Sequence, residues 1–173
     1  VEAEVWRQLA LCAGDKTHPW RTSVLATING EMADARLVVI REVDARQKQL
    51  LFYSDERAGK VVQLLHHPHG TMVMWCPTLA WQLRCRVRLA LEMSGLAASS
   101  RWARIRLSPA AQDYLSPLPP GTPLPAVPAH PPVARDYFAV IDATIESIDW
   151  LELHPDGHRR AIFDGHGPRW VQP

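Results

Sequence analysis

The sequence predicts a mainly β protein, a barrel or a sandwich with a few short flanking helices. Seven or so short apolar segments are separated by turn signals, and few stretches have helical spacing. One segment, residues 82–93, alternates polar and apolar side chains as a strand with one buried face does. The 173 residues suffice for one domain with a substantial core, so we expect residues 1–173 to form a single domain.

The first elements are expected to be a helix and a β-hairpin. Residues 2–13 form the helix, because apolar side chains recur at helical spacing at Val5, Leu9 and Cys12. A strand that starts at residue 20 ends in Asn29-Gly30, the strongest short hairpin signal, and residues 31–44 return as its partner. The middle of this second strand, LVVI, is continuously apolar, which predicts burial on both faces.

The remaining elements follow from the same patterns. A third strand covers 49–55, a helix runs from 56 to a limit at Pro68, and a fourth strand covers 70–76. One or two helices are expected in 99–115, with Ser108 as an N-cap and Pro109 at the first helical position. Eight prolines make 116–135 an extended loop within the domain. Three short strands are then expected at 137–153, 158–164 and 169–172.

Composition argues against several classes of partner. A net charge of +1 gives no reason to expect nucleic acid or an acidic membrane surface as the main partner. No apolar run approaches 18 residues, and the first residues are acidic, unlike a secretory signal. The three cysteines lack metal spacing and indicate reduced thiols, so we expect a cytoplasmic protein without a metal site.

The segment SDERAGK, residues 54–60, places two cations at an expected helix start. Arg57 and Lys60 are three apart and share a face, Ser54 supplies a hydroxyl, and Asp55 is a plausible N-cap. Cations oppose the dipole at a helix N-terminus unless an anion lies between them, so this segment is a candidate phosphate site. A solvated basic face with Glu56 as a partner explains the same residues and stays open as an alternative.

A second basic element flanks the LVVI strand. Arg36 and Arg41 stand at its two ends, five residues apart, so strict alternation places them on opposite faces. Both can serve one ligand only if the strand has a bulge or if they reach different parts of the ligand.

The sequence resembles the pyridoxamine 5'-phosphate oxidase family of FMN-binding split barrels in the order of three segments: R-LVVI-R, FYSDERAGK and a later Trp-Gln strand. The resemblance covers the chain from about residue 20 to 171, and is closest to the oxidase-related branch. It implies an FMN-binding split β-barrel of Greek-key type. It also implies a homodimer with flavin sites at the subunit interface, and a flavin-dependent oxidoreductase that acts on an unidentified small molecule.

The resemblance also implies roles for individual residues. One group would bind the flavin along the second strand and at its phosphate end: Arg36, Val38, Arg41, Tyr53, Ser54, Arg57 and Lys60. Gln82 would hydrogen-bond the isoalloxazine ring. Trp150 and Arg160, ten apart, would contact the flavin from the second subunit.

The sequence departs from the vitamin B6 oxidases at the expected substrate contacts. Asp156 stands where an arginine would grip the substrate, and an acid there repels a phosphate. Gly59 replaces a basic residue, and the proline-rich loop replaces further substrate contacts. We therefore expect FMN without the vitamin B6 substrate. Two alternatives stay open: a flavin-binding or sensing module without turnover, and a β-barrel that binds another phosphorylated ligand.

Overall fold

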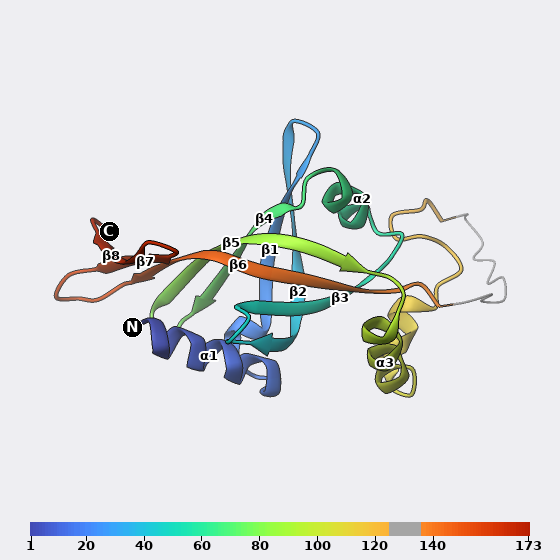
Figure 1. Cartoon of the computed structure of the whole chain (residues 1–173), viewed down its shortest axis with the longest axis horizontal. Coiled ribbons are helices and arrows are strands. Elements are labelled where there is room, and N and C mark those ends of the chain that lie inside the picture. Colours follow the sequence, from blue (N-terminus) through green and yellow to red (C-terminus); the bar gives the residue numbers. More distant parts are fainter. Residues whose placement is uncertain (125–135) are drawn as a thin grey trace.

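The structure, a computed structural model, describes residues 1–124 and 136–173. Its antiparallel strands form one sheet in the order β3-β2-β1-β4-β5-β6-β7-β8, and β3 also pairs with β6. This additional pairing closes β1 to β6 into a barrel, and the β7–β8 hairpin extends beyond it (Figure 1). The strands are β1 Thr22–Asn29, β2 Met32–Asp44, β3 Gln49–Asp55, β4 His69–Cys76, β5 Trp81–Glu92, β6 Phe138–Glu152, β7 Arg159–Asp164 and β8 Gly167–Val171.

Short helices flank the barrel, as the sequence predicts. The helix α1 buries its expected stripe of Val5, Leu9 and Cys12 in the barrel core. Figure 1 places α2 and α3 toward the same end of the molecule. The helices are α1 Glu2–Gly14, α2 Gly59–His66 and α3 Leu96–Ile105, with short 3-10 segments η1 Pro19–Arg21 and η2 Pro109–Tyr114.

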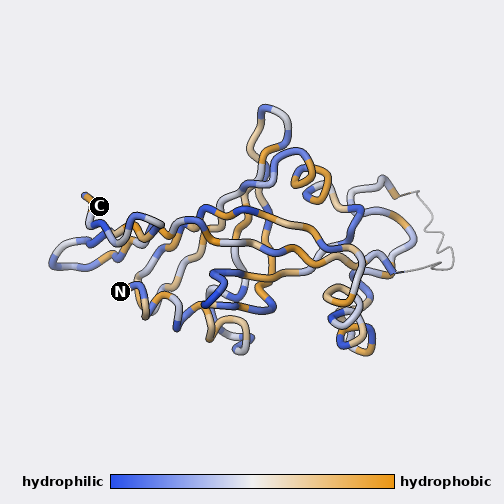
Figure 2. Tube along the Cα trace, viewed as in Figure 1, coloured by the Kyte–Doolittle hydropathy of each residue, from blue (hydrophilic) through white to orange (hydrophobic). Residues whose placement is uncertain are grey.

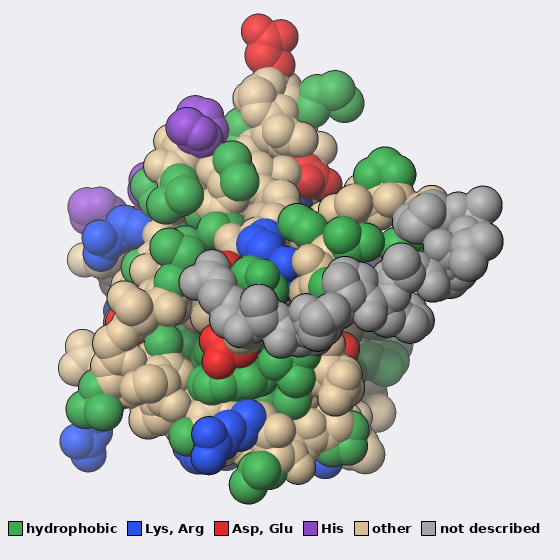
Figure 3. Space-filling view, turned by 90° about the vertical axis from the view of Figure 1, so that its right-hand side faces the viewer, with side chains coloured by type: hydrophobic (Ala, Val, Ile, Leu, Met, Phe, Trp, Pro, Cys, Tyr) green, Lys and Arg blue, Asp and Glu red, His purple; other side chains and the backbone are tan. Residues whose placement is uncertain are grey.

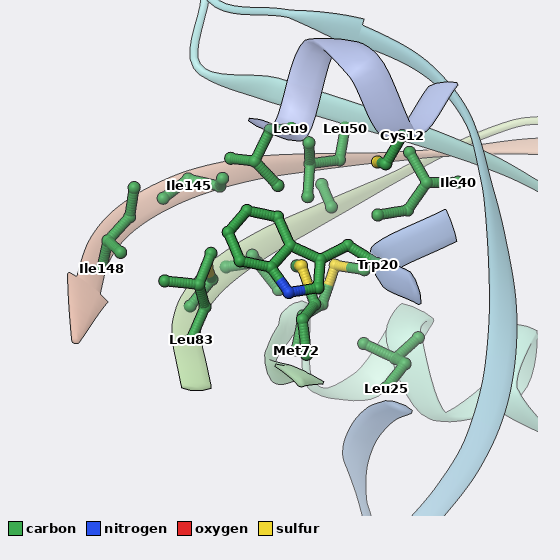
Figure 4. Close-up of a cluster of buried hydrophobic side chains, with 14 of the residues drawn as sticks. Leu9, Cys12, Trp20, Leu25, Ile40, Leu50, Met72, Leu83, Ile145 and Ile148 are labelled. Atoms are coloured by element: carbon green, nitrogen blue, oxygen red, sulfur yellow. The ribbon is translucent and has the colours of Figure 1, made fainter. Parts of the chain in front are cut away.

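The barrel is filled by one apolar cluster around Trp20. Its indole comes from η1 and is fully buried (Figure 4). The side chains packed around it come from a helix and from strands on several sides of the barrel: Leu9, Leu50, Met72, Leu83 and Ile145. Hydrophobic positions run along the barrel strands, whereas the loop between β6 and β7 is hydrophilic (Figure 2). Burial of this apolar surface is the main stabilising term of the fold.

The alternation predicted for 82–93 is confirmed in β5. Its apolar residues from Leu83 to Leu89 point into the barrel and are buried, whereas Arg84, Arg86 and Arg88 point outward and are exposed. The predicted hairpin is also confirmed, one residue later than expected. Asn29 still pairs with Met32, and the turn residue Gly30 has φ +61°, a conformation that favours glycine.

Three local expectations are wrong. LVVI is not buried on both faces, because Leu37 faces outward with 67% of its surface exposed. The helical spacing of Ala58, Val61 and Leu65 predicts one apolar stripe, but Leu65 is 66% exposed, and Leu64 takes its place in the buried stripe of α2. Asp55 does not cap α2, because the helix begins later, at Gly59, and the Asp55 carboxylate instead accepts the N–H of Arg57.

The proline-rich segment is described only in part. Residues 116–124 contain no helix or strand, and 125–135 lie outside the described residues. Ser108 precedes η2 with Pro109 at its first position, as predicted, although the Ser108 hydroxyl donates backward to the Ile105 carbonyl and does not cap η2.

Candidate functional site

The start of α2 is an uncapped helix terminus. Ala58 occupies the N-cap position, and no side chain there accepts a hydrogen bond from the first turn. The first N–H groups of a helix carry partial positive charge and attract an anion. The strand β3 ends at Asp55, directly before this turn, so the geometry of the β3–α2 connection brings Ser54 and Lys60 to the same end of the barrel.

Lys60, in the first turn of α2, carries a charge that the described residues do not neutralise. Its side chain is half-buried, and within 1–124 and 136–173 it has no ion-pair partner. Burial lowers the pKa of Lys60 below its usual 10.5, and the neighbouring Arg36 lowers it further, while Asp55 acts in the opposite direction. A desolvated ammonium beside a second cation is a favourable place for a ligand anion.

Arg36, on β2, is held firmly at this end of the barrel. Its guanidinium donates to the Leu25 carbonyl at 3.2 Å, the Thr27 hydroxyl at 2.5 Å and the Gln63 amide oxygen at 3.0 Å. It also forms a 2.7 Å ion pair with Asp34. The Gln63 amide group donates to the same carboxylate at 2.8 Å, and this bond, followed by the charge of Arg36, lowers the pKa of Asp34. The arginine is therefore preorganised, but its charge is partly neutralised.

Sequence reasoning missed the three polar residues that fix Arg36, which are Thr27, Asp34 and Gln63. The contact of Asp34 with Arg36 could have been predicted, because Asp34 precedes Arg36 by two positions on one strand and so lies on the same face. Gln63 is 8% exposed and reaches Arg36 from another element, so only the folded structure shows their contact.

Ser54 lies at the end of β3 and is 3% exposed. Its hydroxyl donates to the Asp55 carbonyl at 3.0 Å. A hydroxyl has one proton, so Ser54 could donate to a phosphate only by rotating away from this carbonyl.

Arg41 and Tyr53 contact each other. The pairing of β2 with β3 shifts between Ile40 and Glu42, so the bulge considered from the sequence exists at Arg41. The guanidinium of Arg41 lies 5.7 Å from the centre of the Tyr53 ring. The Tyr53 hydroxyl donates to Glu42 at 3.2 Å, and burial, with this carboxylate, raises the pKa of Tyr53 to about 12. Among the described residues, neither of them shares a hydrogen-bond or ion-pair partner with Arg36.

Two of the proposed flavin contacts have side chains inside the barrel. Val38 is 6% exposed and belongs to the core. Trp150 is fully buried, with its ring 5.3 Å from that of Trp81. Strand alternation points the Trp150 side chain inward, and its contact with a flavin from the second subunit stays a prediction.

Gln82 and Arg160 lie on the outer face of the extended sheet. Gln82 pairs with Leu151, which pairs in turn with Arg160, so the strand register places them in one row. Arg160 binds Asp149 at 2.7 and 2.9 Å, and Asp149 also pairs with Arg84. Together these cations lower the pKa of Asp149.

Arg57 is held by contacts within the protein that use four of its five N–H donors. It binds the carboxylate of Asp55 at 2.7 and 3.0 Å and lies 3.3 Å from the centre of the Tyr137 ring. It also donates to the backbone carbonyls of Ser116 and Pro117. Figure 3 shows basic and acidic side chains among apolar ones on this side of the molecule. The candidate phosphate cluster is therefore Lys60, Arg36 and the start of α2.

The barrel and this cluster together define a β-barrel domain with a candidate anion site at a helix terminus. A sequence model described as "Pyridoxamine 5'-phosphate oxidase, FMN-binding domain" matches residues 3–91, which is more than half of the 173 residues. The chain therefore belongs to this family, and the resemblance inferred from its motifs is confirmed.

Solved structures confirm the predicted split-barrel fold. A pyridoxamine 5'-phosphate oxidase-related, FMN-binding protein from Nostoc punctiforme is 21% identical, with a TM-score of 0.75, over 99% of this chain and 96% of that one. PhzG from Burkholderia lata, in complex with tetrahydrophenazine-1-carboxylic acid, is 14% identical, with a TM-score of 0.76, over 99% and 91%. General Stress Protein 26 from Bacillus anthracis is 12% identical, with a TM-score of 0.57, over 85% and 93%.

No curated protein sequence matches the chain. Among the helices of 1–124 and 136–173, none has the length and apolar character needed to cross a membrane. In the same residues, no three His, Cys, Asp or Glu side chains are grouped so that they could hold a metal ion.

Proposed function

We propose that this protein binds FMN with its phosphate at the start of α2. The observation that carries the proposal is the half-buried ammonium of Lys60, which lies beside Arg36 at an uncapped helix terminus and lacks a carboxylate partner among the described residues. A phosphate supplies the negative charge that this arrangement lacks, and helix N–H groups supply hydrogen bonds. Membership of the FMN-binding family supports FMN as the source of the phosphate.

Lys60 and Arg36 would bind the phosphate in different ways. Lys60 contributes a mobile point charge, and Arg36 contributes a guanidinium that Thr27 and Gln63 hold in place. When bound, FMN would supply the electron-transfer chemistry, while the chain binds and orients it. On this basis the protein is a flavin-dependent oxidoreductase of an unidentified small molecule.

The outer face of the sheet supports a homodimer. Strand pairing places Leu37, Val24 and Val73 in one cross-strand row that continues into Arg84 and Asp149. Leu37 is 67% exposed, and Trp75 on the same face of β4 is 44% exposed. A partly exposed apolar row bordered by charged residues is typical of a protein–protein interface. We propose that two copies meet here and that Gln82 and Arg160 contact the flavin from this face.

Pyridoxamine 5'-phosphate is not the substrate that we propose. Asp156 lies in the β6–β7 loop with 92% of its side chain exposed, and its carboxylate is 3.8 Å from His154. An anionic side chain there opposes a phosphorylated substrate.

Absorbance and flavin titration test the proposal. The purified protein should be yellow or become so with FMN, and riboflavin, which lacks the phosphate, should bind more weakly. Equal affinity for the two flavins would refute the phosphate site at α2. Sustained NAD(P)H oxidation by the FMN-loaded protein would support an oxidoreductase, and its absence with a range of acceptors would favour a flavin-binding module without turnover.

A further inference from the structure

Arg57 joins three segments that are far apart in the sequence. Its guanidinium binds Asp55 at the end of β3 through Nε and one terminal nitrogen, at 3.0 and 2.7 Å. It donates to the carbonyls of Ser116 at 2.9 Å and Pro117 at 3.4 Å. Its Cζ atom lies 3.3 Å from the centre of the Tyr137 ring. Ser116 and Pro117 begin the proline-rich segment, and Tyr137 follows its end.

This set of contacts leaves Arg57 little capacity for a ligand. The hydrogen bonds to Asp55, Ser116 and Pro117 use four of the five N–H donors of the guanidinium. Its partner Asp55 has only 4% of its side chain exposed, and Arg57 itself 17%. One N–H donor is left, and a phosphate that took more of the guanidinium would compete with a nearly buried carboxylate for its partner, which is unfavourable.

Backbone hydrogen bonds reinforce the same junction. The Glu56 N–H donates to the Tyr137 carbonyl at 2.7 Å, and the Tyr137 N–H donates to the Tyr114 carbonyl at 3.0 Å. The two stems of the proline-rich segment therefore lie beside the turn that precedes α2. Arg57, in this turn, is three residues before Lys60. The side chain of Arg57 contacts both stems.

We propose that Arg57 is a positioning residue that fixes both stems of the proline-rich segment beside the phosphate cluster, and is not a phosphate ligand. Its effect on flavin binding rests on the proposed FMN site, whereas its structural role does not. Loss of Arg57 should loosen the stems and weaken FMN and riboflavin by the same factor, because the phosphate contacts of Lys60 and Arg36 remain.

Amide hydrogen exchange of the flavin-free protein tests the structural part. Arg57→Lys keeps the charge but loses the planar, two-pronged contact with Asp55 and the stacking on Tyr137. Exchange at the Glu56 and Tyr137 amides should become at least tenfold faster, and exchange at the Ile145 amide in β6 should stay unchanged. Arg169→Ala, which removes an exposed pair with Asp164, is the matched control.

Two outcomes of this experiment would overturn the anchoring role: unchanged exchange at both amides, or equal acceleration throughout the chain. If Arg57→Lys does not fold, the double variant Asp55→Asn/Arg57→Gln removes both charges together and is measured in its place. The same two amides should then exchange faster than the rest of the barrel, and a uniform change would again refute the role.

Flavin titration tests the second part. The ratio of the FMN and riboflavin dissociation constants should be the same in wild type and Arg57→Lys, even as both affinities fall. A ratio that shifts tenfold toward riboflavin would identify Arg57 as a phosphate ligand and overturn the proposal. If wild type binds neither flavin, the FMN site is wrong, and hydrogen exchange alone then decides whether Arg57 anchors the stems.

Discussion

Replacing Lys60 by methionine should have opposite effects on the free and the flavin-bound protein. Lys60 is half-buried beside Arg36, and this desolvation and like charge already lower its pKa in the free protein. Methionine keeps most of the chain length and removes the charge. The free protein should therefore become more stable, by about 0.2–1 kcal/mol, the range of a partly exposed charge pair.

Binding of FMN should weaken in the same variant. The lost contact is a charge-assisted hydrogen bond to phosphate, worth about 1.5–3 kcal/mol. That free energy corresponds to a roughly ten- to 150-fold higher dissociation constant for FMN. Riboflavin has no phosphate, so its dissociation constant should change less than about twofold.

Isothermal titration with both flavins and urea unfolding of the free protein measure these quantities. Lys16→Met, at an exposed position after α1, is the matched control and should change neither. The reasoning is refuted if Lys60→Met weakens FMN and riboflavin equally, because the lysine would then act through structure. It is refuted as well if the free variant is less stable, because the ammonium would then have a stabilising partner.

Three further results are expected. The preference for FMN over riboflavin should decline at alkaline pH with a midpoint below 10.5. Phosphate binding raises the lowered pKa of Lys60, so affinity for FMN is lost as the pH rises through the pKa of Lys60 in the free protein. An unchanged ratio of the two dissociation constants up to pH 11 would contradict this. Leu37→Asp should yield monomers in sedimentation, whereas Leu107→Asp, also exposed, should leave dimers. Gly70→Ala should lower the free energy of unfolding by about 1–3 kcal/mol, because its Cβ would lie 2.8 Å from a β1 carbonyl oxygen, whereas Gly165→Ala, with open space, should not.

Much of the barrel was predictable because its strands follow local rules. The alternation in β5 and the hairpin turn depend on neighbours in sequence; the alternation appears as expected, and the turn lies one residue later than expected. The pairing of β3 with β6, which closes the barrel, joins Tyr53 to Val140 across a long stretch of chain and has no local signal. An apolar run such as LVVI does not reveal which face the folded chain leaves open, so the exposure of Leu37 was missed.

The candidate site was predicted less well, because adjacent cations looked equivalent in sequence. Helical spacing from residue 56 placed Arg57 and Lys60 on one helix face, but α2 begins at Gly59, so Arg57 precedes the helix and turns toward Asp55. The resemblance assigned Trp150 and Arg160, ten apart, to a partner's flavin, yet the two residues lie on opposite faces of the sheet: Trp150 is buried in the barrel, and Arg160 is half-buried on the outer face. A spacing of ten residues does not show on which face of the sheet each side chain lies.

Charge compensation by nearby carboxylates separates the cations that spacing alone could not. Arg36 and Arg57 each follow an aspartate by two positions, and each binds that aspartate, Asp34 and Asp55, at 2.7 Å. Lys60 has no acidic residue two positions before it and no ion-pair partner among the described residues. A paired arginine attracts a ligand anion less strongly than a free ammonium does, because its carboxylate partner cancels part of its positive field. Lys60 therefore differs from both arginines, because no carboxylate among the described residues balances its charge. Its contribution depends most on a bound anion, which makes Lys60 the centre of the proposed site.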